Sequence, residues 1–360
     1  MKKVLILANN DVGLYKFRRE LIQELVKNYE VYISLPYGEF IPHLKEIGCK
    51  FFETEISRRG TNPITDLKLL LNYKKIIKKV DPDVVLTYTI KPNVYGGLAC
   101  RMNRVPFIAN ITGLGSAVEN GGILQKITLL LYRIALRKAK CVFFQNEENR
   151  SFLIKRKIIN GKNKLLPGSG VNLDYYSLID YPSDAVINFL FIARIMKEKG
   201  IEQFLDAACC IKDKFPNTKF HILGFCEEAY QKKLKDLQDK GIIIYHGMKS
   251  DVREFQRISH CTIHPSYYPE GMSNVLLESA ASGRPIITTN RSGCKEIVED
   301  RKSGYLIEPE NSEDLIEKVE MFLKLNYEEK KIMGLTGRAK VEKEFDRQYV
   351  LDAYLQEIEC

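Results

Sequence analysis

The sequence predicts an α/β protein built from two doubly wound domains. Strand-like and helix-like segments alternate along the chain, and this alternation stops at a polar stretch and then restarts. A chain of 360 residues is too long for one ordinary hydrophobic core and suits two domains. We therefore expect domains over residues 1–175 and 176–345, with a helix at 346–360 that crosses back to the first domain.

The first domain is expected to hold a parallel sheet. Residues 3–8 form a continuous apolar run, which is typical of a strand buried on both faces. Further strands are expected at 31–35, 51–54, 84–88, 106–111 and 141–145. Amphipathic segments predict helices near 14–28, 39–47 and 64–79.

The second domain repeats this pattern after the polar stretch at 169–184. Its expected strands are 188–193, 220–224, 242–245, 262–264 and 285–289. A helix is expected at 199–214, and charged amphipathic helices are expected at 312–325 and 328–359. In such sheets, ligands bind beyond the carboxyl ends of the strands, so the loops that follow the strands hold the candidate site.

Composition favours a cytoplasmic protein. No run of about 18 uncharged apolar residues is present, and Asn9, Asn10 and Asp11 end the first apolar run too early for a signal peptide. The nine cysteines include no Cys-x-x-Cys pair, so we interpret them as reduced, mostly buried residues. We expect a cytoplasmic protein that is peripheral on the inner face of the cell membrane.

Charge is distributed unevenly between the halves. Residues 1–175 hold 29 Lys and Arg against 15 Asp and Glu, whereas residues 176–360 hold 26 against 31. A basic half indicates an anionic partner, which is a nucleic acid, an anionic lipid surface or a pyrophosphate-bearing substrate. The basic stretches 74–79 and 126–140 either lie on an anionic membrane or pack their apolar residues into the core.

Two charged pairs follow predicted strands of the second half. Arg194 follows one strand, and Lys199 opens the next helix. Their two positive charges and the N–H groups at the helix start would form a site for a diphosphate. The alternative is a solvated pair of surface cations. Glu270 precedes a helix expected from about Met272, and Glu278 lies roughly 12 Å further on. That separation suits two carboxylates that hold different parts of one ligand rather than a glycosidase pair. The alternative is a loop residue and an exposed helical charge.

The order Arg194-x4-Lys199 followed by Glu270-x7-Glu278 resembles family 4 of the retaining glycosyltransferases. These enzymes have the GT-B fold, two doubly wound Rossmann-like domains facing across a cleft. Residues 292–297 and 304–307 fit the same pattern. Residues 13–18 and 110–115 are similar to the subgroup that builds capsule, exopolysaccharide and O-antigen repeat units.

The resemblance implies a reaction and a set of site residues. The enzyme would move a hexose or N-acetylhexosamine from a UDP-sugar to a saccharide linked to undecaprenyl diphosphate, with retention and without a metal or cofactor. Arg194, Lys199 and Glu270 would be catalytic, the two cations at the diphosphate and Glu270 at the donor sugar. Glu278 would bind the ribose. The other donor-binding residues implied are Gly13, Met248, Gly271, Met272, Ser273 and Asn274, and the acceptor-side residues are Lys16, Lys91 and Thr112.

Some features depart from the family pattern or leave alternatives open. Thr112 stands where many members have a histidine, so a histidine role in the first half is doubtful. A metal site is not expected, because the basic pair Arg194 and Lys199 supplies the charge that a divalent cation supplies in other enzymes. A nucleotide-sugar epimerase or hydrolase on the same fold is the first alternative. A basic nucleic-acid-binding protein is the second, but the basic half shows neither a reading helix nor aromatic platforms, and no nucleic-acid partner is expected.

Overall fold

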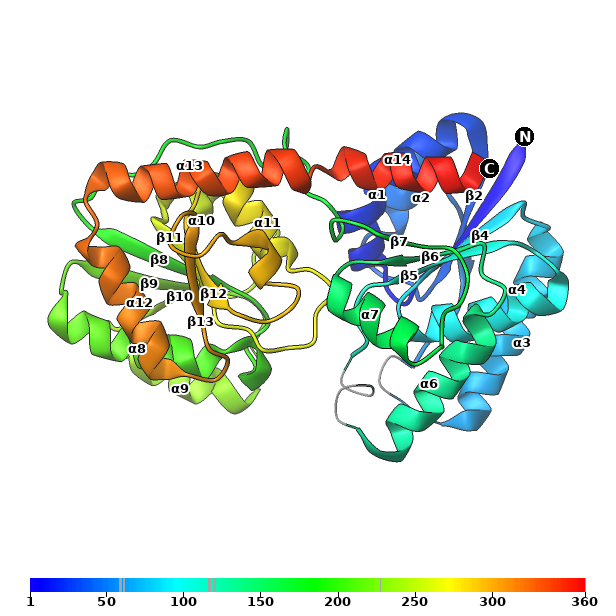
Figure 1. Cartoon of the computed structure of the whole chain (residues 1–360), viewed down its shortest axis with the longest axis horizontal. Coiled ribbons are helices and arrows are strands. Elements are labelled where there is room, and N and C mark those ends of the chain that lie inside the picture. The colour runs from blue at the N-terminus through cyan, green and yellow to red at the C-terminus, as the bar shows by residue number, and fades with distance from the viewer. Residues whose placement is uncertain (58–59, 61, 116–117, 119–120, 227, 360) are drawn as a thin grey trace. The chain divides into compact units, whose positions relative to one another are not determined.

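The computed structural model describes residues 1–57, 60, 62–115, 118, 121–226 and 228–359. Figure 1 shows helices and strands alternating along the whole chain. The chain divides into two compact units. Unit 1 comprises Met1–Ser169, Pro269–Met272 and Gln348–Cys360, and unit 2 comprises Gly170–Tyr268 and Ser273–Arg347. Each unit is built on its own parallel sheet, so the predicted α/β class is confirmed.

Unit 1 contains a seven-stranded parallel sheet with the order β3-β2-β1-β4-β5-β6-β7. Every residue of β4 and β5 is buried, because helices cover both faces, and this explains the continuous apolar runs in the sequence. The strands are β1 (Lys2–Leu7), β2 (Tyr29–Leu35), β3 (Lys50–Glu53), β4 (Val84–Tyr88), β5 (Phe107–Ile111), β6 (Cys141–Phe144) and β7 (Asn163–Leu165).

Side chains of the sheet alternate between two hydrophobic clusters, one on each face. Val4 and Ile6 pack in the cluster that includes α1, α2 and α14, whereas Leu5 and Leu7 pack in the cluster that includes α3, α4 and α6. The helices of unit 1 are α1 (Asp11–Asn28), α2 (Ile41–Ile47), α3 (Pro63–Val80), the π-helix η1 (Pro92–Gly96), α4 (Gly97–Asn103), α6 (Gly122–Leu136), α7 (Glu147–Lys155) and α14 (Arg347–Glu359).

Unit 2 contains a six-stranded parallel sheet with the order β10-β9-β8-β11-β12-β13. Its strands are β8 (Ile187–Ile192), β9 (Thr218–Leu223), β10 (Ile244–Tyr245), β11 (Cys261–His264), β12 (Ile286–Thr289) and β13 (Gly304–Ile307). Its helices are η2 (Lys197–Lys199), α8 (Ile201–Lys214), α9 (Glu228–Asp239), α10 (Arg253–Ile258), α11 (Asn274–Ala281), η3 (Lys295–Ile297), α12 (Ser312–Lys324) and α13 (Tyr327–Glu344). The strand order reverses direction between β8 and β11, and ligands of open α/β sheets bind at such points.

The C-terminal helix α14 belongs to unit 1. The buried Glu357 carboxylate lies 2.8 Å from Lys162 Nζ and 2.7 Å from Lys164 Nζ. Asn110 Nδ2 donates to the Tyr354 hydroxyl at 2.6 Å. Because these partners come from strands β5 and β7 or the residues beside them, ionic and polar contacts fix α14 to the sheet of unit 1.

Some local expectations from the sequence are wrong. One helix was expected over 328–359, but it is broken between α13 and α14, because Val171 N donates to Phe345 O at 2.9 Å and Arg347 N donates to Val171 O at 3.0 Å. Strand β7 was not expected. Within the described part of the chain, no helix has the length and hydropathy needed to span a membrane.

Candidate functional site

Two cations of unit 2 lie against one aromatic ring at the strand-order reversal. Arg194 follows β8, Lys199 ends η2, and Tyr268 lies in the loop after β11. Arg194 Cζ is 5.6 Å from the centroid of the Tyr268 ring, and Lys199 Nζ is 4.8 Å from it. The ring attracts both cations and so holds two positive charges close together, although they repel one another.

Backbone contacts hold the loops after β8 and β11 together. Tyr267 N donates to Glu198 O at 3.0 Å. Gly200 has φ +75°, and a Cβ at this position would overlap the carbonyl of Pro265. Only glycine combines this left-handed backbone with so close an approach, and Gly200 therefore places Lys199 directly beside the β11 loop.

The β8 end carries positive charge that faces solvent. The Arg194 side chain is exposed, and among the described residues no carboxylate forms an ion pair with it. Helix α8 begins at Ile201, two residues after Lys199, and its first N–H groups add a partial positive charge. Two cations and a helix N-terminus suit the binding of an anion such as a diphosphate.

Helix α11 begins at Asn274, two residues later than the sequence suggested. Ser273 has an extended backbone, and its N–H donates to Gly293 O at 2.7 Å. The Ser273 N–H is therefore occupied and is not open to a ligand. The Asn274 Oδ1 atom is buried and accepts no hydrogen bond from the described residues. Buried polar atoms usually have partners, so a ligand that donates a hydrogen bond would satisfy Asn274.

Glu278 lies on α11 and is half-buried. Its carboxylate accepts a hydrogen bond from the Tyr176 hydroxyl, and burial, followed by the negative charge of Glu278, raises the pKa of Tyr176. This contact orients the carboxylate, so Glu278 differs from a freely solvated helical charge.

Met248 is exposed in the loop after β10, next to the loop after β9. Gly224 N donates to Gly247 O at 2.9 Å, which joins the two loops. His221 Nδ1 lies 3.0 Å from His246 Nε2 in the same region. Burial, together with the nearby positive charges, lowers the pKa of His221 to about 4, so both imidazoles stay neutral at pH 7.

The segment that carries Glu270, Gly271 and Met272 makes most of its contacts with unit 1 and is assigned to it. Thr112 directly follows β5, and a Cβ on Gly271 would overlap the Thr112 carbonyl. The structure therefore brings Thr112 together with the segment that carries Glu270.

Three other residues predicted for the site also belong to unit 1. Gly13 lies in the first turn of α1, and its N–H donates to the Asn10 side chain at 2.6 Å, so this donor is not open to a phosphate. Lys16 is exposed on α1. Lys91 Nζ lies 2.6 Å from Asp66 Oδ1, so its positive charge is neutralised within the protein.

Several contacting residues were not singled out from the sequence. Tyr268 contacts both cations, Tyr176 bonds Glu278, and Asn146 bonds the segment of Glu270. The signal for Tyr268 and Asn146 was their position in loops that follow strands. In the described ranges, no three His, Cys, Asp or Glu side chains are grouped closely enough to hold a metal ion.

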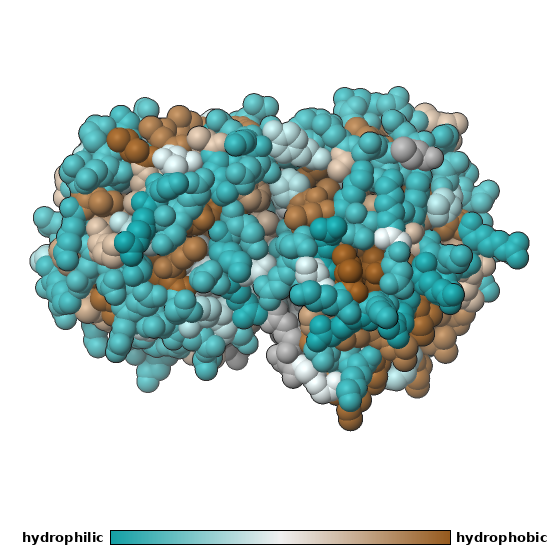
Figure 2. Space-filling view, viewed as in Figure 1, coloured by the Kyte–Doolittle hydropathy of each residue, from teal (hydrophilic) through white to brown (hydrophobic). Residues whose placement is uncertain are grey.

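Two helices of unit 1, α3 and α6, expose apolar side chains. Ile76 and Ile77 of α3 are buried, so the apolar residues of the stretch 74–79 pack into the core, whereas Ile64, Leu67 and Leu71 at the start of α3 are exposed. On α6, Tyr132 and Leu136 are buried. Apolar atoms gather over α6 at the surface in Figure 2. The exposed apolar residues of α6 are Ile123, Leu124, Ile127, Leu130 and Ile134.

The fold is that of an α/β protein with two Rossmann-like parallel sheets. Residues 3–146 match the family model described as "Glycosyl transferase 4-like", and residues 184–340 match the model described as "Glycosyl transferases group 1". Together the two matches span most of the chain. The chain belongs to family 4 of the glycosyltransferases, with the GT-B fold.

Similar proteins act on lipid-linked sugars or build capsule. The chain is 26% identical to the N,N'-diacetylbacillosaminyl-diphospho-undecaprenol alpha-1,3-N-acetylgalactosaminyltransferase of Campylobacter jejuni, covering 97% of this chain and 96% of that protein. It is 25% identical to the UDP-Gal:alpha-D-GlcNAc-diphosphoundecaprenol alpha-1,3-galactosyltransferase of Escherichia coli, covering 79% and 78%. It is 24% identical to the capsular polysaccharide biosynthesis glycosyltransferase CapM of Staphylococcus aureus, covering 96% and 93%.

Solved structures share the fold over the full length. Anabaena HepE in complex with UDP and glucose has a TM-score of 0.80 at 17% identity, covering 100% of each chain. A glycosyltransferase from Rickettsia africae has a TM-score of 0.77 at 20% identity, covering 99% of this chain and 98% of that chain. At this level of identity, the likeness concerns the fold alone.

Proposed function

We propose that this glycosyltransferase transfers a hexose or N-acetylhexosamine from a UDP-sugar to a saccharide linked to undecaprenyl diphosphate, in the synthesis of a surface polysaccharide. The transfer proceeds with retention and without a metal ion. The observation that carries the proposal is the placement of Arg194 and Lys199 on the Tyr268 ring, beside the start of α8.

In this proposal, unit 2 binds the donor. Arg194 and Lys199 bind the diphosphate, and Glu278, oriented by Tyr176, accepts hydrogen bonds from the ribose hydroxyls. The buried Asn274 Oδ1 accepts a hydrogen bond from the ligand. The exposed loop at Met248 lies next to the base.

The chemistry follows from these charges. The acceptor hydroxyl oxygen bonds to the anomeric carbon as the bond from that carbon to the β-phosphate oxygen breaks, and the hydroxyl proton passes to the leaving phosphate. Negative charge grows on the diphosphate in the transition state, and Arg194 and Lys199 stabilise it, as a divalent cation does in other enzymes. Glu270 contacts the donor sugar. Because attack and departure occur on the same face, the configuration is retained.

Unit 1 binds the acceptor, with Thr112 and Lys16 on the acceptor side. Lys91 contributes indirectly, since Asp66 already holds its ammonium group. The undecaprenyl diphosphate acceptor is proposed because the Campylobacter jejuni and Escherichia coli relatives are named for such substrates. Both relatives are named for alpha-1,3-linked products, which supports retention where the donor is also α-linked.

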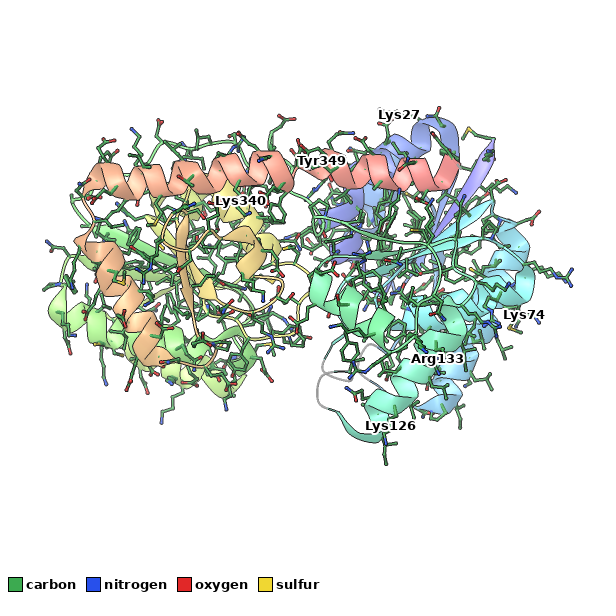
Figure 3. The ribbon with its side chains drawn as sticks, in the orientation of Figure 1. Lys27, Lys74, Lys126, Arg133, Lys340 and Tyr349 are labelled. Carbon is green, nitrogen blue, oxygen red and sulfur yellow. The ribbon has the colours of Figure 1, made fainter. Side chains whose placement is uncertain are left out.

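We further propose that the basic unit 1 contacts an anionic membrane through α6. The exposed residues Ile123, Ile127, Leu130 and Ile134 follow the spacing i, i+4, i+7 and i+11, which places them in one stripe on the helix. Lys126 and Arg133 project from the same helix in Figure 3. An apolar stripe flanked by basic side chains matches the acyl boundary and anionic head groups of a lipid surface.

Vesicle sedimentation tests the membrane contact. The chain is expected to bind vesicles that contain anionic lipid, and salt is expected to release it. The variant Ile127→Asp/Leu130→Asp is expected to bind about ten-fold more weakly, because it places two carboxylates in the apolar stripe. The variant Ile332→Asp/Leu335→Asp on α13 of unit 2 is the control, because these two residues have the same spacing and are also exposed. Equal binding to neutral and anionic vesicles contradicts this contact.

A transfer assay tests the enzymatic proposal. The protein is incubated with UDP-galactose, UDP-N-acetylgalactosamine, UDP-glucose or UDP-N-acetylglucosamine, with and without a saccharide linked to a polyprenyl diphosphate. Transfer is expected only with the acceptor present, and chelation of divalent cations is expected to leave it unchanged. An epimerase or hydrolase would consume the donor without an acceptor, and this result would contradict the proposal.

A further inference from the structure

The segment that carries Glu270 is held by unit 1, although its neighbours on both sides belong to unit 2. Residues Pro269–Met272 make their contacts in unit 1, whereas Tyr268 and Ser273 belong to unit 2. A segment of four residues forms no hydrogen-bond ladder of its own. Its conformation, and therefore the direction of the Glu270 side chain, depends on what holds its backbone.

Asn146 supplies the polar contacts to this backbone. Its Nδ2 donates to Gly271 O at 2.6 Å and to Glu270 O at 3.1 Å. The Asn146 residue is only 2% exposed, so its hydrogen bond to Gly271 O is buried and its hydrogen bond to Glu270 O is partly buried. One buried amide therefore fixes two consecutive carbonyls, and a buried carbonyl that loses its donor is costly.

Close backbone packing limits where the segment lies. A Cβ on Gly271 would overlap the side chain of Gln145 and the carbonyl of Thr112. Gly113 has φ +134°, and a Cβ on it would lie 3.2 Å from both Gly271 N and Pro269 O. The residues that follow β5 and β6 therefore pack directly on the segment; Gly271 has no space for a side chain, and Gly113 combines a tight contact with a left-handed backbone.

A second hydrogen bond fixes the orientation of the Asn146 amide. Asn146 is the N-cap of α7, and its Oδ1 accepts from Asn149 N at 2.8 Å. Because Oδ1 faces the helix, Nδ2 faces the carbonyls of Glu270 and Gly271. The start of α7 thus fixes the orientation of the amide donor.

We propose that Asn146 is a positioning residue for Glu270: it fixes the peptide carbonyls of the segment so that the Glu270 side chain is directed at the donor sugar. This inference rests on the role of Glu270 in the proposed function. It predicts that Asn146 affects the use of the sugar and leaves the binding of the nucleotide unchanged.

Two substitutions separate positioning from capping. Asn146→Asp and Asn146→Ser both keep an oxygen that caps α7, but both lose the amide donor. Asn146→Asp also places negative charge against two carbonyl oxygens. The matched control is Asn311→Asp, because Asn311 caps α12 in the same way through Asp314 N and has no contact with this segment.

The experiment measures kcat and KM for transfer from the active UDP-sugar, the dissociation constant of UDP, and the melting temperature. We expect kcat to fall about 10- to 100-fold in Asn146→Asp and less in Asn146→Ser, because a catalytic group displaced by about 1 Å loses that much. The dissociation constant of UDP is expected to stay within about two-fold, since UDP lacks the sugar. Asn311→Asp is expected to match the wild type.

The outcomes distinguish this inference from the proposed function. Full activity in Asn146→Ser and Asn146→Asp, with Glu270→Gln inactive, overturns the positioning role and leaves the function standing. Full activity in Glu270→Gln removes the role of Glu270 itself. A weakened binding of UDP in Asn146→Ser that accounts for the whole loss of activity also overturns the inference, because it indicates a general effect on the fold.

Discussion

The two sheets share one topology but differ in what their charges do. In unit 2, Arg194 at the β8 end is exposed and forms no ion pair with the described residues. In unit 1, Lys91 after β4 is paired with Asp66, and Arg18 is buried between the rings of Tyr88 and Tyr354. These two cations of the basic half are therefore held by other side chains of the protein, while the acidic half exposes Arg194.

This comparison shows that net charge does not locate an anion site. The excess of Lys and Arg lies in residues 1–175, yet the candidate diphosphate site lies in the half with more Asp and Glu. Much of the basic excess lies on surface helices such as α3 and α6. The candidate site is distinguished by Arg194, a cation at the end of a strand that forms no ion pair with a carboxylate of the described residues.

The largest effect is expected from Lys199→Ala and Glu270→Ala. Removing one group that stabilises developing charge costs about 10²- to 10³-fold in kcat. Lys199→Ala is also expected to weaken UDP binding, whereas Glu270→Ala is expected to leave it nearly unchanged. Transfer assays and calorimetry check this difference, and circular dichroism checks that both variants are folded. Activity near the wild-type level in either variant would contradict the catalytic role assigned to that residue.

A smaller effect is expected from Gly200→Ala. The left-handed backbone of Gly200 costs a non-glycine residue roughly 1–2 kcal/mol, and overlap with Pro265 adds to it. Gly241→Ala is the control, because Gly241 has φ +71° but no atom within 4 Å of its Cβ position. Chemical unfolding is expected to show a larger loss of stability in Gly200→Ala. Equal losses would mean that the β8 and β11 loops are not tightly packed.

A loss of about ten-fold in donor affinity is expected for Glu278→Gln, since a hydrogen bond to a charged group contributes roughly 1.5 kcal/mol. Its kcat is expected to change little, because the ribose does not take part in the reaction. Steady-state kinetics with varied donor measure this split. Glu317→Gln, which changes an exposed glutamate of helix α12, serves as the control. A change confined to kcat would contradict the ribose assignment.

The smallest effect concerns pH. His221 has a folded pKa of about 4 and an unfolded pKa near 6.5, so the unfolded state binds the extra proton between these values. The free energy of unfolding is therefore expected to fall as pH falls from about 6.5 to 4. His221→Gln is expected to reduce this fall by on the order of 1 kcal/mol at pH 5. Urea unfolding at pH 7 and pH 5 measures it, and an unchanged pH slope contradicts the neutral state of His221.

Buried strands were the part of the fold that the sequence predicted well. The strand expected at 84–88 matches β4, because a strand buried on both faces needs a continuous apolar run. The edge strand β7 was missed, since its three residues are polar or exposed. The break before α14 was missed because it depends on Val171, a residue distant in the sequence.

The contacts within the site were less predictable than its charged residues. Arg194 and Lys199 were identified by their spacing, but spacing carries no information on Tyr268, which contacts both. Likewise, the Asn146 contact joins residues 124 or more positions apart, and only the fold brings them together. The neutralisation of Lys91 by Asp66 is another such tertiary effect.

Calorimetric titration with UDP and with uridine tests the central claim that the β8 end of unit 2 binds a diphosphate. The wild type is expected to bind UDP about 100-fold more tightly than uridine, because charge-assisted hydrogen bonds to the phosphates contribute a few kcal/mol. Arg194→Ala is expected to lose most of this preference, and Lys235→Ala, which changes an exposed lysine of α9, is expected to keep it. Equal binding of UDP and uridine by the wild type, or an unchanged preference in Arg194→Ala, would contradict the claim.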